Sequence, residues 1–197
     1  MQEKQSLSAR RISSVVIIVL LIFVGVPLMI KNIYGVEQAF KKTPAGEIEI
    51  KNIPESTVLV AESGGNYYGG RNTLFRRLFN YINENNVAMT VPVEARVENA
   101  QMKFYVGTKD KIKELKDQGS VQVVTVPQRT VASIGIRGAY TESNFVKAKA
   151  TLEQWLKDNT EYRQAGDAYA VFWDAPFMPF FLKRSEVHIT VDKMTKQ

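Results

Sequence analysis

The stretch VPQRTVASIGIRG, residues 126–138, repeats the pattern of an earlier stretch, IPESTVLVAESGG, residues 53–65. Each contains a proline, two polar residues, a Thr-Val pair and a strand-like run that ends in glycine. A segment with apolar residues at helical spacing follows each stretch, roughly at 72–84 and at 143–159. An offset of 74 positions places Leu74, Leu78, Tyr81 and Ile82 on Ala148, Leu152, Trp155 and Leu156. The chain therefore contains an internal repeat.

Two strand-like runs follow each predicted helix. MTVPVEARVE and MKFYVGT come after the first, and YAVFWD and EVHITV come after the second. In the last run the alternation places Val187, Ile189 and Val191 on one face and His188 on the other. Each half thus reads strand–strand–helix–strand–strand. Two such halves most simply form one antiparallel sheet with both helices on one side, an α+β fold.

The N-terminal part carries an uncharged run of eighteen residues, SSVVIIVLLIFVGVPLMI, at 13–30. This length is just sufficient for a helix to cross a bilayer. A cleaved signal peptide is the nearer alternative, but the run is long and lacks a small-residue cleavage pattern. Arg10 and Arg11 precede the run, which favours a cytoplasmic N-terminus. We expect a cytoplasmic tail at 1–12, a transmembrane signal anchor at 13–30, a linker at 31–46 and a domain at 47–197 outside the cytoplasmic membrane, periplasmic in a Gram-negative cell.

The composition excludes several kinds of chemistry. The chain has no cysteine and a single histidine, His188, so cysteine-based sites, His-pair metal sites and freely built Ser-His-Asp triads are not expected. No nucleophile with an activating base is recognisable, which predicts a protein that is not an enzyme, with no catalytic residues. The net charge of +6 is spread along the chain without a nucleic-acid-binding motif, and we expect no nucleic-acid partner.

Three segments carry a family resemblance: RGAYTESNFVKA at 137–148, the M-T-x-P-V strand at 89–93, and the Pro-rich DAPFMPFFLKRSEV at 174–187. Together they resemble the SOUL heme-binding protein family, with the expected anchor indicating a membrane-anchored, bacterial-type member. Departures from the family pattern are Ala175, Lys183 and Ser185. The resemblance implies a pseudo-twofold repeat of βαββ-type units forming a twisted antiparallel sheet or distorted barrel flanked by two helices. It also implies non-covalent binding of heme or another tetrapyrrole in an apolar cleft beside the first helix.

Candidate site residues lie mainly on that first helix. Phe75 and Phe79 are four residues apart, share one face, and match family positions that line the cleft. A heme site needs an apolar slot and cations at its rim for the propionates. The expected cleft comprises Phe75, Phe79, Leu78 and Met89, and the expected rim comprises Arg71, Arg76 and Arg77. Periodicity alone favours the alternative of core phenylalanines and a solvated arginine face. The family resemblance balances it, and both interpretations stay open.

His188 is a possible axial ligand of heme iron, because histidine is a common one. The alternative is a histidine on the polar face of a strand, and we favour it. No other metal site is expected.

The segment 177–181 raises a separate question, because Pro176 and Pro179 exclude it from regular structure. Its large apolar side chains are either buried against the sheet or exposed as a membrane or partner surface. We favour burial.

These observations predict a membrane-anchored, non-enzymatic protein that buffers, carries or senses heme. The alternative is a module that binds another apolar or cationic small molecule, as in multidrug-sensing effector domains of the same repeated fold. Those domains use a buried carboxylate, and Glu62 is the candidate here.

Overall fold

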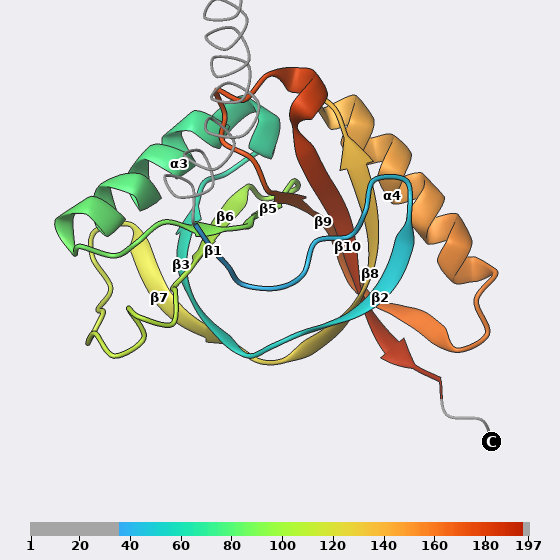
Figure 1. Ribbon diagram of the computed structural model, residues 1–197, viewed down its shortest axis with the longest axis horizontal. Helices are drawn as coiled ribbons and strands as arrows, with labels where there is room; N and C mark the ends of the chain where they lie inside the picture. Colours follow the sequence, from blue (N-terminus) through green and yellow to red (C-terminus); the bar gives the residue numbers. More distant parts are fainter. Residues whose placement is uncertain (1–35, 195–197) are drawn as a thin grey trace, which may run out of the picture. The chain divides into compact units, whose positions relative to one another are not determined.

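The structure is a computed structural model that describes residues 36–194. Eight strands form one antiparallel sheet in the order β2-β8-β10-β9-β5-β6-β3-β7 (Figure 1). The strands are β2 (Ile48–Ile53), β3 (Ser56–Glu62), β5 (Val93–Arg96), β6 (Gln101–Tyr105), β7 (Val121–Val126), β8 (Arg129–Arg137), β9 (Tyr162–Phe172) and β10 (Arg184–Lys193).

The strand order reads the same from either edge when the two halves of the chain are exchanged. β5 and β9 meet at the centre, with Val93 opposite Phe172. The first strand of each half pairs with a strand of the other half: β2 pairs with β8, and β7 pairs with β3. Each edge of the sheet is therefore supplied by the opposite half, which ties the two repeats into one unit.

Both helices cover the same face of this sheet. Helix α3 (Tyr67–Glu84) is capped by Asn66, whose side chain accepts from the Tyr68 amide at 2.8 Å, and it packs on β3, β6 and β7. Helix α4 (Glu142–Lys157) is capped by Thr141 and packs on β8, β9 and β10. Each buries one apolar stripe: Tyr67, Leu74, Leu78, Tyr81 and Ile82 on α3, and Phe145, Ala148, Leu152 and Leu156 on α4. The main core lies between these stripes and the sheet.

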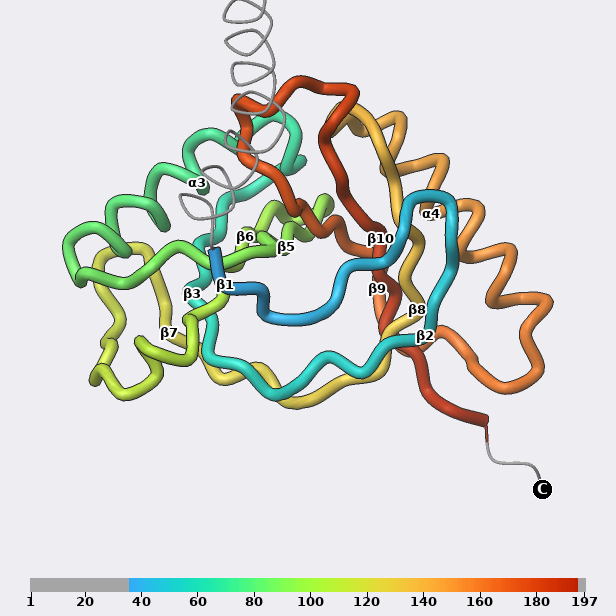
Figure 2. Tube along the Cα trace, in the orientation of Figure 1, coloured from blue at the N-terminus to red at the C-terminus, as the bar shows by residue number. Residues whose placement is uncertain are grey.

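Residues 39–46, which we call the strap, lie on the other face of the sheet. The preceding short strand β1 (Glu37–Gln38) pairs in parallel with β4 (Thr90–Val91), and the strap then runs across to β2 (Figure 2). The amide of Gly46 donates to the carbonyl of Gly135 at 2.9 Å. A Cβ atom at Gly135 would lie 2.1 Å from the carbonyl oxygen of Pro44, so only glycine in β8 allows the strap to approach this closely.

The predicted fold class was wrong and needs two corrections. Among residues 36–194 no helix is long and apolar enough to cross a membrane; the predicted transmembrane helix at 13–30 lies outside the described residues. The sheet ends at two edge strands, β2 and β7, so of the two predicted forms it is the open antiparallel sheet and not the barrel. Each half is strand–strand–helix–strand–strand, as the pattern of its sequence predicted, and not the βαββ unit that the family resemblance implied. The predicted location relative to a membrane stays a prediction.

Candidate functional site

The outward side of α3 presents a pair of stacked aromatic rings. The centroids of Phe75 and Phe79 are 5.8 Å apart and their planes differ by 15°. Phe75 is half-buried and packs edge-on against Phe104 of β6 at 5.4 Å. Phe79 is 41% exposed. The i, i+4 spacing places both rings on one side of the helix, and the structure leaves the outer ring open to contact.

The other two residues of the predicted cleft are placed differently. Leu78 is fully buried beneath α3, within the main core. Met89 is half-buried just before β4 and packs against the same core. A ligand on the outer side of α3 would therefore meet Phe79 and the edge of Phe75 first, with Leu78 behind them as support.

The three predicted rim arginines are cations without a carboxylate partner among residues 36–194. Arg71 donates to the carbonyl of Tyr140 at 3.2 Å, and Arg77 donates to the carbonyl of Glu62 at 3.0 Å. Arg76 is exposed. Backbone carbonyls orient two of these side chains without neutralising them, so the positive charge remains available to an anionic group.

The equivalent positions on α4 carry opposite charges instead of aromatic rings. The offset that superimposes the buried stripes places Phe75 on Lys149 and Phe79 on Glu153. Lys149 Nζ and Glu153 Oε1 are 3.9 Å apart, an exposed i, i+4 ion pair of the kind that stabilises a helix only slightly. The fold does not require aromatic residues at this position, which singles out the face of α3.

His188 lies at the centre of the opposite face of the sheet, with no exposed surface. Its Nε2 is 2.6 Å from Glu186 Oε2, and its Nδ1 is 3.3 Å from the hydroxyl of Tyr169. Both ring nitrogens are thus engaged, and iron ligation would require one of these hydrogen bonds to break. Burial lowers the pKa of His188, which favours the neutral ring.

Glu186 is the hub of this buried centre. Its carboxylate is 2.7 Å from the Thr43 amide and 2.8 Å from each of three donors, the Trp173 indole, the Ser133 hydroxyl and Lys51 Nζ. Burial alone would raise the pKa, but His188 and Lys51 outweigh it and lower the pKa of Glu186 to about 2. The carboxylate is charged and fully satisfied, and it fastens the strap through Thr43.

A second buried ion pair extends the network across the sheet. Arg129 donates to the carboxylate of Glu94, which also accepts from the hydroxyl of Tyr105. Arg129 also reaches the hydroxyl of Tyr169, at 3.3 Å, and so links this pair to His188. Lys51 and Arg129 therefore each compensate one buried acid.

The strap seals this centre from the outside. The centroid of the Phe40 ring is 5.6 Å from that of Tyr105, 5.5 Å from that of Trp173 and 5.7 Å from that of His188. The sequence pattern did not single out Glu186 as a buried group. A signal was present, because Glu186 and His188 alternate with apolar residues in β10 and therefore share one face.

Two hollows in the surface lie away from the stacked pair. One, of about 200 Å³, is polar and includes Glu94, Lys103 and Arg129 in its lining. The other, of about 320 Å³, lies beside the first turns of α4 and includes Glu98, Glu142 and Glu153. Neither of these two hollows is lined by Phe75 or Phe79.

Comparisons with solved structures support the fold. The crystal structure of the EcmrR C-terminal domain is similar with a TM-score of 0.61 at 16% identity, covering 75% of this chain and 98% of that chain. An uncharacterised conserved protein from Listeria innocua has a TM-score of 0.53 at 12% identity, covering 76% and 94%. A protein from the same organism described as a hydrolase has a TM-score of 0.52 at 12% identity, covering 82% and 96%. At these identities the likeness concerns the fold alone.

No curated protein matches the chain. The model of the SOUL heme-binding protein family, in contrast, matches residues 34–190, which include the strands β1 to β9, both helices and most of β10. This match agrees with the three motif segments and supports a heme-binding role. The chain belongs to the SOUL heme-binding protein family.

Proposed function

We propose that the protein binds heme or a related tetrapyrrole non-covalently on the outer face of α3, without catalysing a reaction. Membership of the heme-binding family supplies the ligand class. The observation that carries the placement is the exposed stack of Phe75 and Phe79, at a position where the equivalent helix α4 has Lys149 and Glu153. One of the two repeats offers an apolar plate and the other does not.

The residues on this face fit the chemistry of the ligand. Heme is a flat apolar disc with two carboxylates, and an exposed aromatic ring can stack on such a disc. Phe75 holds the orientation of Phe79 because it is itself packed against Phe104. Arg76 is exposed on the same helix and has no carboxylate partner in the described part of the chain, so it is available to a propionate.

Binding on this face uses packing and does not use the iron. The only imidazole, His188, is buried on the opposite face of the sheet and is held by Glu186 and Tyr169. Heme and metal-free protoporphyrin should therefore bind with similar affinity. A ligand held on an open face also exchanges readily, which suits a protein that buffers, carries or senses heme.

The alternative ligand, an apolar cation, depends on a carboxylate that remains available. Glu62 is exposed at the end of β3 and hydrogen-bonds with Gln101. The buried acids Glu94, Asp110 and Glu186 are paired with Arg129, Lys113 and Lys51. A tetrapyrrole with its propionates is a better match for the free arginines of α3.

The test is a titration of the full chain with hemin and with protoporphyrin, followed by absorbance of the Soret band. Phe79→Ala should weaken both ligands about tenfold, because one aromatic contact contributes about 1–3 kcal/mol of burial. Val146→Ala is the matched control, since Val146 is an exposed apolar residue of α4, 54% accessible. The proposal is contradicted if Phe79→Ala binds like the unmodified protein, or if both variants lose affinity equally.

A further inference from the structure

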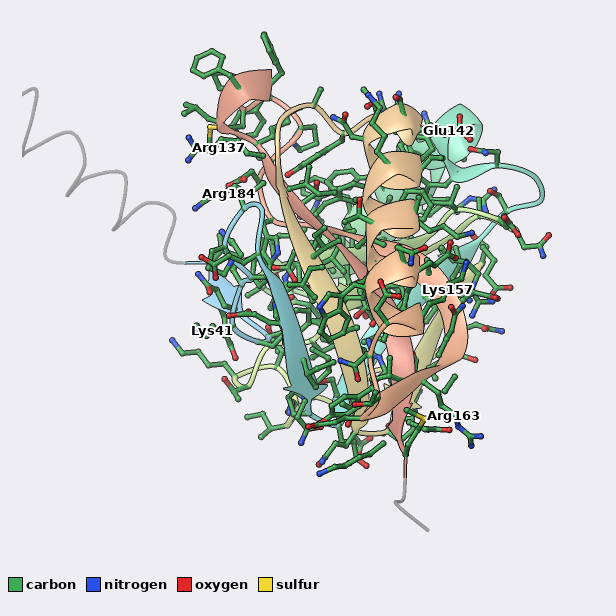
Figure 3. All side chains as sticks on the ribbon, turned by 90° about the vertical axis from the view of Figure 1, so that its right-hand side faces the viewer. Lys41, Arg137, Glu142, Lys157, Arg163 and Arg184 are labelled. Carbon is green, nitrogen blue, oxygen red and sulfur yellow. The ribbon has the colours of Figure 1, made fainter. Side chains whose placement is uncertain are left out.

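The connection between β9 and β10 exposes a compact group of large apolar side chains. Residues 175–183, which we call the hairpin tip, include Phe177, Phe180, Phe181 and Leu182, which are 75%, 66%, 58% and 44% exposed. The expected burial of Phe177, Phe180 and Phe181 is therefore wrong, and Met178 is half-buried. In Figure 3 aromatic side chains stand out from the ribbon at this end of the hairpin. A soluble surface rarely gathers so much apolar area without using it.

The hairpin tip is a folded element and not a frayed loop. The amide of Met178 donates to the carbonyl of Ala175 at 3.0 Å, and the short 3-10 helix η2 (Phe180–Leu182) forms the next turn. Lys183 Nζ donates to the carbonyl of Pro176 at 2.8 Å and so joins the two ends of the hairpin tip. The apolar side chains are therefore held outward by backbone geometry.

The base of the hairpin tip is also fastened to the sheet. Asp174 accepts from the backbone amide of Arg184 at 2.6 Å and from its guanidinium at 2.7 Å. The hydroxyl of Tyr140 donates to the carbonyl of Arg184 at 2.9 Å and accepts from the amide of Asp174 at the same distance. Because of these hydrogen bonds at its base, the hairpin tip is held in a fixed position on the sheet.

Beyond its base, the hairpin tip carries positively charged side chains and no acidic ones. The segment 175–185 contains no acidic residue and carries two cations, Lys183 and Arg184. Arg137 of β8 is the register partner of Arg184, is exposed, and has no carboxylate partner in the described residues; both arginines are labelled beside the tip in Figure 3. Asp174 neutralises Arg184, which leaves Lys183 and Arg137 as the net positive rim.

We propose that the hairpin tip docks into the surface of a lipid bilayer that contains anionic lipids. A protruding group of aromatic side chains is suited to the boundary between headgroups and acyl chains, where such rings are favoured. A rim of cations directly behind the rings meets the negative headgroups at the same time. A partner protein would need a deep apolar pocket with acidic edges, whereas a bilayer accepts the convex tip as it is.

The chain has no cysteine, so a single introduced cysteine can be labelled without ambiguity. The experiment uses the full chain with an environment-sensitive fluorophore at Phe181→Cys. The matched control carries the same label at Ile112→Cys, because Ile112 is also a highly exposed apolar residue, in the loop between β6 and β7. Each is mixed with phosphatidylcholine vesicles, with or without phosphatidylglycerol, and quenching by nitroxide-labelled lipid reports contact with the bilayer.

We expect a blue-shifted, lipid-quenched signal at position 181 with phosphatidylglycerol vesicles and a water-like signal at position 112. Adding Phe177→Ser and Phe180→Ser to the label at 181 should abolish quenching, and Arg137→Gln should weaken binding about fivefold. The inference fails if position 181 stays water-like, if positions 112 and 181 respond alike, or if neutral vesicles give the same signal. Far-UV circular dichroism and thermal unfolding of each labelled chain show that the fold is retained.

Discussion

The stacked face of α3 leaves apolar surface in contact with solvent, whereas the carboxylate at the buried centre around Glu186 has all of its hydrogen bonds. Phe79 leaves 41% of its surface exposed and stacks on Phe75. The carboxylate of Glu186, in contrast, accepts from five groups and is 1% exposed. Apolar surface left in water can still be stabilised by a ligand, whereas a saturated polar centre has nothing left to offer.

His188 and Phe79 show the same difference, although His188 is the residue that a sequence would suggest first as a ligand. His188 is the only imidazole of the chain, yet both of its nitrogens are used to hold the strap side of the sheet together. Phe79 is one of ten phenylalanines, yet its position leaves it free to contact a ligand. Residue type alone therefore ranks these two sites in the wrong order. Four predictions test this comparison.

The largest effect is expected from Glu186→Gln. Removing the charge leaves the half-buried Lys51 without its carboxylate partner and weakens the attachment of Thr43. Removing one partner of a buried ion pair costs about 3–5 kcal/mol of unfolding free energy. Urea denaturation measures the loss, with exposed Glu47→Gln as the control. Hemin affinity of the folded fraction should stay within about twofold. A loss of stability below about 1 kcal/mol would show that the centre does not hold the strap.

Acid should weaken the buried centre and spare the stacked face. The pKa of Glu186 is lowered to about 2 from an ordinary 4.5, so its stabilisation is complete above pH 4.5 and is lost as the pH falls toward 2. The loss amounts to about 3 kcal/mol. The lowered pKa of His188 also makes the folded protein less stable as the pH falls below about 6.5. Urea denaturation between pH 7 and pH 3 should show this decline in the unmodified protein and in Phe79→Ala, and a shallower decline in Glu186→Gln.

Phe79→Glu places on α3 the residue that α4 has at the equivalent position. Hemin affinity should fall about a hundredfold, because the aromatic contact is lost and a negative charge faces the propionates. Asn80→Glu is the matched control, since it adds the same charge at the neighbouring exposed position and keeps the ring. Equal losses in the two variants would show that net charge, and not the stacked pair, determines affinity.

The smallest effect is expected from Arg76→Gln. An exposed cation contributes little in water, so hemin affinity should fall only about threefold, and the difference should vanish at high salt. Lys157→Gln, at the exposed end of α4, removes one charge far from the pair as the control. A salt-independent loss of more than tenfold would mean that Arg76 is buried against the ligand and that the propionates lie deeper than proposed.

Local pattern was sufficient to predict the helices and their buried stripes. The structure places α4 at Glu142–Lys157, within two residues of the predicted 143–159, and buries Ala148, Leu152 and Leu156 as the spacing indicated, with Trp155 half-buried. Helix α3 begins at Tyr67, five residues before the predicted start at 72. The pairing of Phe75 with Phe79 was predictable for the same reason, since residues four apart on a helix are always neighbours. Helix spacing and alternation depend only on the nearest turns of the chain.

The sequence by itself thus determined the repeat, the two helices and the position of the aromatic pair. Only the tertiary structure decided that β2 and β7 exchange halves, that the strap covers Glu186 and His188, and that the hairpin tip stands in solvent. Each of these outcomes depends on contacts between residues far apart in the chain: Thr43 meets Glu186 across 143 positions. Periodicity shows which side of an element is apolar, but what covers that side is settled by packing between distant segments.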